Sequence, residues 1–219
     1  PLIMIFIIGL VDDYINLSVL KRFLSVTVIL FFYFTFNKEF LLSEFIINYS
    51  FLNLNFYQSL FLSIFLILGF IHVMNMSDGR NGLIVSYLIL IISYLAFKND
   101  FYLDSIYLLI LFNLILTLIL NIFNFSYFGN NGILVISVFF GTILFQLYDE
   151  KVFYIREIFI LLFIPFYDGL YVTFKRLIKK KNPFIPDRSH LHHLSSKSNW
   201  YLSLIIIISV KILLLYILN

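Results

Sequence analysis

Long apolar runs alternate with short polar breaks along the whole chain. The runs cover residues 1–11, 23–36, 59–74, 83–97, 102–120, 133–147, 158–174 and 200–218. A helix of about 20 apolar residues crosses the hydrocarbon core of a bilayer. Helices suit that environment because they satisfy their own backbone hydrogen bonds. The pattern therefore predicts an all-α integral membrane protein with about eight transmembrane helices in this chain.

Two stretches depart from this pattern. The first run is too short to cross a membrane by itself, and the chain begins with Pro1 rather than Met. We therefore expect a fragment that has lost N-terminal helices. Residues 39–58 are only partly apolar and partly alternating, which favours an interfacial hairpin or an amphipathic segment over a span. Because no internal repeat or low-complexity linker divides the chain, residues 1–219 are expected to form one multi-span membrane domain.

Composition strengthens the membrane prediction and removes several alternatives. The chain is 62% hydrophobic and 12% charged, whereas soluble domains are roughly 45–50% apolar and about 25% charged. It contains no Cys, which excludes thiolate chemistry and disulfides. The net charge of +3 does not indicate nucleic acid binding, because the basic residues follow a membrane pattern.

That pattern appears when successive runs are taken to cross the membrane in alternate directions. The loops 12–22, 75–82, 121–132 and 175–199 then hold ten of the 15 Lys and Arg residues. The loops on the other side hold Lys38, Lys98, Lys151 and Arg156. Because Lys and Arg are retained on the cytoplasmic side of short loops, the first set of loops is predicted to face the cytoplasm.

Asp12 and Asp13 directly follow an apolar run, at the predicted membrane boundary. Adjacent residues of a helix point in different directions, so the two carboxylates cannot share one face. Splayed apart, they can bind a divalent cation and orient a second group. The alternative is a solvated helix end, although the helix dipole disfavours acids at a C-terminus.

Two further polar breaks lie on the same predicted side. NMSDGRNGL, at 75–83, contains Asn75, Asp78 and Asn81, whose oxygens suit a nucleotide or its metal. FGNNG, at 128–132, places Asn130 between two glycines. Each of the two segments, taken alone, is better explained as an ordinary polar turn.

The stretch Pro183 to Leu194, PFIPDRSHLHHL, is the densest cluster of chemically active side chains. Its two prolines disfavour a continuous helix, so a structured loop is expected. His190, His192 and His193 are candidate metal ligands, but no Cys or further His accompanies them. Arg188 beside them favours phosphate, which a guanidinium binds through two parallel hydrogen bonds.

Taken in order, the motifs D-D, N-x-x-D-G-x-N-G, G-x-x-G and P-F-x-x-D-R-x-H-x-H-H resemble the polyprenyl-phosphate N-acetylhexosamine-1-phosphate transferases, within glycosyl transferase family 4. The resemblance runs from about Gly9 to His193. The last motif is closer to the branch that initiates O-antigen, enterobacterial common antigen or teichoic-acid linkage than to the phospho-MurNAc-pentapeptide translocases.

The resemblance implies transfer of a sugar 1-phosphate, expected to be N-acetylhexosamine 1-phosphate, from a UDP-sugar to undecaprenyl phosphate with release of UMP. This is the first membrane step in the synthesis of cell-surface polysaccharides such as lipopolysaccharide O-antigen. It implies a bacterial inner membrane location, a cytoplasmic active site and Mg²⁺ as cofactor, with Mn²⁺ as the alternative ion. The expected partners are the UDP-sugar, undecaprenyl phosphate and membrane lipid, with no nucleic acid and with a homodimer as a candidate assembly.

The resemblance also assigns roles to residues. Asp12 and Asp13 match the catalytic aspartate pair and are expected metal ligands, together with Asp78 and Asn130. The residues expected to bind substrate are Asn75, Asp78, Asn81, Arg188, His190, His192 and His193. Attack by the lipid phosphate, either directly or through a phospho-aspartate, is compatible with these assignments.

Asn130 is the main departure, because the family usually has Asp there as a magnesium ligand. A neutral amide holds a hard cation less strongly than a carboxylate. The competing hypothesis is therefore a catalytically degenerate paralogue, or a transporter or scaffold that binds a nucleotide-sugar or lipid carrier. A transporter should place charge at mid-membrane. Lys211 lies clearly inside an apolar run, at a position from which we expect it to snorkel to an interface.

Overall fold

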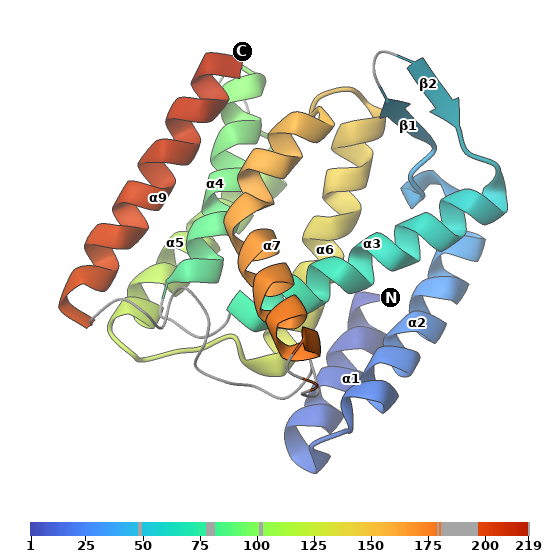
Figure 1. Cartoon of the computed structure of the whole chain (residues 1–219), viewed down its shortest axis with the longest axis horizontal. Coiled ribbons are helices and arrows are strands. Elements are labelled where there is room, and N and C mark those ends of the chain that lie inside the picture. The colour runs from blue at the N-terminus through green and yellow to red at the C-terminus, as the bar shows by residue number, and fades with distance from the viewer. Residues whose placement is uncertain (48–49, 78–81, 101–102, 179, 181–196, 219) are drawn as a thin grey trace. The chain divides into compact units, whose positions relative to one another are not determined.

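The computed structural model describes residues 1–47, 50–77, 82–100, 103–178, 180 and 197–218 (Figure 1). Each predicted apolar run corresponds to one α-helix, which confirms the all-α membrane prediction. The helices are α1 (Leu2–Ile15), α2 (Val19–Phe36), α3 (Phe56–Ser77), α4 (Leu83–Lys98), α5 (Ser105–Ile122), α6 (Gly129–Asp149), α7 (Ile155–Ile178) and α9 (Lys197–Leu218).

Within the described ranges, four helices have both the length and the apolar composition of a membrane span. They are α2, residues Phe56–Asn75 of α3, α5 and α6. At about 1.5 Å per residue, an 18-residue helix covers about 27 Å, close to the thickness of the hydrocarbon core. Residues Leu83–Lys98 and Leu202–Ile217 form shorter apolar helices.

The chain divides into two compact units. The first comprises Pro1–Asn75 and Phe128–Ile155, and therefore contains α1, α2, α3 and α6. Its core joins Ile5 of α1, Leu30 of α2, Ile67 of α3 and Val138 of α6. Gly141 of α6 allows close packing on α3, because a Cβ there would lie 3.3 Å from the Ile67 side chain.

The segment between α2 and α3 is a hairpin, as one of the two interpretations of residues 39–58 predicted. A short 3-10 helix, η1 (Lys38–Phe40), precedes strands β1 (Glu44–Ile47) and β2 (Ser50–Asn53), which pair antiparallel with Glu44 opposite Asn53. Its N-terminal side is fixed by two hydrogen bonds. The Leu42 N–H donates to Ser63 Oγ at 3.0 Å, and the Ser43 N–H donates to Asp149 Oδ2 at 2.8 Å.

The second unit comprises Met76–Tyr127 and Arg156–Asn219, and contains α4, α5, α7 and α9. Leu83 and Tyr87 of α4 pack against Leu204 of α9, and Figure 1 shows these two helices side by side. The end of α4 and the start of α7 are joined by an ion pair between Lys98 Nζ and Glu157 Oε1 at 2.8 Å. Glu157 is fully buried.

Candidate functional site

The aspartate pair lies in the last turn of α1 and not in a loop beyond it. The helix ends at Asn16, which has a φ of 52° and whose N–H donates to the Asp12 carbonyl at 2.8 Å. Asn is one of the few residues besides Gly that adopt this left-handed conformation readily. The chain then reverses into α2, whose first turn is capped by Ser18.

This reversal brings Arg22 of α2 onto Asp12. Arg22 Nη1 donates to Asp12 Oδ2 at 2.7 Å, and the exposed fractions of the two side chains are 18% and 3%. An acid at a helix C-terminus and a base at a helix N-terminus each oppose the local helix dipole. Their mutual attraction offsets both costs.

Asp13, by contrast, is exposed. The two carboxylates therefore diverge, as their adjacent positions on a helix predict. Asp12 forms an ion pair with Arg22, whereas the exposed Asp13 is accessible to a ligand.

The first turn of α6 packs directly on α1, one turn before the aspartates. A Cβ at Gly9 would lie only 2.6 Å from the Asn131 Cα, so only Gly permits this approach. The FGNNG motif is thus the start of α6, where sequence analysis expected a turn before the helix. Asn130 is half-buried. Among the described residues, Asn131 Oδ1 is buried and has no hydrogen-bond partner.

Sequence reasoning missed two members of this cluster. In the sequence analysis, Arg22 is treated only as one of the basic residues of its loop. A basic residue shortly after an aspartate pair at a helix end could have predicted an ion pair. Asn131 has the same side chain as Asn130. Its orientation toward α1 depends on the close approach at Gly9, which no local pattern reveals.

The other expected site residues are placed only in part. Asn75 is half-buried in the last turn of α3, directly after the buried Met74. The remainder lie outside the described residues: Asp78, Asn81, Arg188, His190, His192 and His193. In the part of the chain that the structure describes, no three His, Cys, Asp or Glu side chains form a metal-binding group.

Asn121, at the end of α5, is a further polar residue that sequence analysis did not single out. Its Oδ1 accepts a hydrogen bond from the N–H of Gly82, the residue directly before α4. Its Nδ2 donates to the Ser126 carbonyl at 2.8 Å. Asn121 thereby fixes the end of the NMSDGRNGL segment to the loop that leads toward α6.

Lys211 does not snorkel, and this corrects the sequence expectation. Lys211 is a residue of α9, and its side chain is buried, with only 3% of the residue exposed. The Nζ atom donates to the Leu161 carbonyl and lies 4.1 Å from the centroid of the Tyr87 ring.

These features define a helical, multi-pass membrane protein with an acidic and amide-rich cluster where two helices meet. Residues 1–148 match the family described as Glycosyl transferase family 4, and the chain belongs to that family. An undecaprenyl-phosphate alpha-N-acetylglucosaminyl 1-phosphate transferase of Thermotoga maritima is 30% identical to it over 86 residues. That match covers 39% of this chain and 28% of the length of the relative.

Proposed function

We propose that the protein transfers a sugar 1-phosphate, N-acetylhexosamine 1-phosphate in the first instance, from a UDP-sugar to undecaprenyl phosphate with release of UMP. The observation that carries this proposal is the division of the aspartate pair. Asp12 is held by Arg22 at 2.7 Å, while Asp13, one turn after the contact of Gly9 with Asn131 of α6, remains exposed. Family membership and the name of the Thermotoga relative support the same chemistry.

The oxygen atoms at this junction are of the kind that Mg²⁺ accepts. They are the Asp13 carboxylate, the Asn130 amide and the buried Asn131 Oδ1, which has no hydrogen-bond partner among the described residues. Magnesium is commonly held by one or two carboxylates together with substrate phosphates and water. When bound, the ion would offset the repulsion between the two anionic substrates. Asp13 and the two amides would hold it, with Asp78 as a further candidate.

The remaining chemistry falls to the side chains of the protein. Asp13 orients the lipid phosphate and accepts its proton. A lipid phosphate oxygen then forms a bond to the sugar-bearing phosphorus of the UDP-sugar. The bond from that phosphorus to the bridging oxygen breaks, and UMP leaves with the electron pair. Arg22 holds Asp12 in place through their ion pair, so that the end of α1 has one orientation. Catalysis of this kind consists mainly of positioning and charge stabilisation.

The test is a membrane assay with radiolabelled UDP-GlcNAc and undecaprenyl phosphate, with and without Mg²⁺. Asp13→Asn should lower kcat by about 100-fold or more, the range typical of losing an acid–base group. Asp104→Asn is the matched control, because Asp104 is exposed and lies before α5. Transfer that persists in Asp13→Asn, or that does not need a divalent ion, would contradict the proposal.

A second function is favoured by Asn130 itself, because this residue replaces an expected carboxylate. A degenerate paralogue would bind the nucleotide-sugar or lipid carrier without transferring the sugar phosphate. Asn130→Asp distinguishes the two functions. An inactive parent that gains transfer on this substitution has a decayed metal site. If the parent and Asn130→Asp are both inactive with several UDP-sugars, the transferase proposal fails.

A further inference from the structure

Lys211 is a buried cation that the proposed chemistry does not use. It lies in the apolar helix α9, with 3% of the residue exposed. A charged group in such surroundings is costly unless it is paired or hydrogen-bonded. The contacts that Lys211 makes therefore indicate why it is there.

The first contact is with the Leu161 carbonyl of α7, which has no N–H of its own helix to accept from. In an α-helix the N–H of residue 165 would donate to the carbonyl of residue 161. Residue 165 is Pro, which has no N–H, yet α7 continues from Ile155 to Ile178. The Leu161 carbonyl accepts instead from Lys211 Nζ. Lys211 thus replaces the backbone donor that Pro165 removes.

The second contact is with α4. Lys211 Nζ lies 4.1 Å from the centroid of the Tyr87 ring, and Tyr87 is 1% exposed. A desolvated ammonium over an aromatic face is a favourable arrangement. One ammonium group therefore joins α4, α7 and α9.

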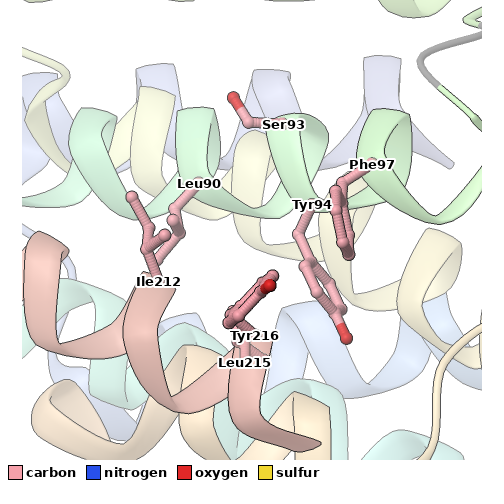
Figure 2. A pocket seen from close by; sticks show the side chains of 7 residues that line it. All are labelled: Leu90, Ser93, Tyr94, Phe97, Ile212, Leu215 and Tyr216. Carbon is pink, nitrogen blue, oxygen red and sulfur yellow. The ribbon is translucent and has the colours of Figure 1, made fainter. Parts of the chain in front are cut away.

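An apolar pocket lies between α4 and α9, next to Lys211 in the sequence of α9. A cavity of about 190 Å³ lies between the two helices, lined by Leu90 and Tyr94 of α4 and by Ile212 and Leu215 of α9. Figure 2 shows these side chains converging on it from the two helices.

The three helices are also those that adjoin the expected donor-binding segments in the sequence. The NMSDGRNGL segment leads into α4, and the PFIPDRSHLHHL segment lies between α7 and α9. We infer that Lys211 is a positioning residue, which supplies the hydrogen-bond donor that Pro165 removes from α7 and so sets the spacing of α4, α7 and α9. This inference rests on the proposed function for the identity of the ligand.

A double-mutant cycle between residues 211 and 165 tests the inference in the detergent-solubilised protein. Lys211→Met removes the donor and should lower the midpoint of thermal unfolding by about 5 °C or more. Adding Pro165→Ala restores an N–H to α7 and should recover at least half of that loss. Lys211→Arg keeps a donor and should retain most of the stability. Additive effects of the two substitutions would overturn the inference.

Leu204→Ala is the matched control for general loosening of α9, because Leu204 packs on Leu83 and Tyr87 of α4 and its apolar side chain cannot donate a hydrogen bond to α7. It should lower the midpoint, but Pro165→Ala should not recover that loss. Recovery there would mean that Pro165→Ala simply stabilises the fold, and would also overturn the inference.

The positioning role is tested by equilibrium binding of radiolabelled UDP-GlcNAc. Lys211→Met should weaken binding about threefold or more, with recovery in the Lys211→Met/Pro165→Ala double variant and in Lys211→Arg. Unchanged binding in Lys211→Met would refute the positioning role. Failure of the proposed function would appear differently, as a parent protein that binds UDP-GlcNAc but transfers nothing to undecaprenyl phosphate.

Discussion

Individual residues decide how the aspartate pair is presented. Gly9 sets the approach of α6, Asn16 ends α1, and Arg22 binds Asp12. None of these three carries out the proposed chemistry. Each fixes a backbone position or a charge on which Asp13 depends.

Arg22→Met should destabilise the protein by about 3–5 kcal/mol, because it leaves the buried Asp12 carboxylate without its partner. Thermal unfolding in detergent measures the effect. Lys21→Met is the matched control, since Lys21 is exposed on the same helical turn, and it should change stability by less than about 0.5 kcal/mol. Equal losses in the two variants would show that the ion pair has no special role.

Gly9→Ala should force α1 and α6 apart, because the new Cβ would meet the Asn131 backbone at 2.6 Å. We expect a loss of about 1–3 kcal/mol, the usual range for overpacking, and a loss of transfer activity. Gly69→Ala in α3 is the control, because a Cβ there would meet nothing within 4 Å. It should leave stability unchanged or raise it, by up to about 1 kcal/mol. A tolerated Gly9→Ala would contradict the close approach.

At the scale of single residues, the sequence predicted the aspartate pair and its divergence but not its neighbours. The contact between Asp12 and Arg22 depends on the left-handed Asn16, which closes the reversal between α1 and α2. The distinction between Asn130 and Asn131 depends on the rotational position of α6 relative to Gly9. Both are consequences of tertiary packing, so residue spacing alone could not supply them.

At the scale of elements, the apolar runs located each α-helix that the structure describes but misjudged some ends. α1 continues past its apolar run to Ile15, and α6 begins at Gly129, before its run. Polar residues can continue the backbone hydrogen bonds of a helix. The end of an apolar run in the sequence is therefore not the end of the helix. This is why Asp12, Asp13 and the start of the FGNNG motif lie in helical turns.

The junction of α4 and α7 gives a prediction at this scale. Lys98→Met removes the 2.8 Å ion pair with the fully buried Glu157, and should lower the free energy of unfolding by about 3–5 kcal/mol, the range for breaking a buried pair. Lys151→Met is the control, because its 3.6 Å pair with Glu44 is half-exposed, and exposed pairs contribute only about 0–1 kcal/mol. The prediction fails if the control is as destabilised as Lys98→Met.

At the scale of the whole molecule, the proposal requires the polar segments to face one aqueous compartment. The distribution of Lys and Arg predicts the cytoplasm for the segments around residues 12–22 and 175–199. It predicts the opposite side for residues 98–101 and 148–157. The absence of Cys from the sequence makes this arrangement simple to test.

Single cysteines at Ser18 and Ile178 should react with a membrane-impermeant maleimide in inverted vesicles but not in right-side-out vesicles. Cysteines at Asn99 and Glu150 should show the reverse pattern. All four positions are exposed, so poor reactivity would not come from burial in the fold. Labelling of Ser18→Cys and Ile178→Cys from opposite sides would refute a shared site.

Asn121 has a consequence for how this protein can change through evolution. Its side-chain amide accepts a hydrogen bond from the Gly82 N–H and donates one to the Ser126 carbonyl. A replacement must therefore provide both an acceptor and a donor at the same distance from the backbone. Asp lacks the donor, Ser is too short, and Leu offers neither. Saturation mutagenesis should therefore find this position nearly invariant, even though the proposed chemistry does not use it. A lineage that abandoned catalysis would be expected to drift at Asp13 long before it drifted at Asn121.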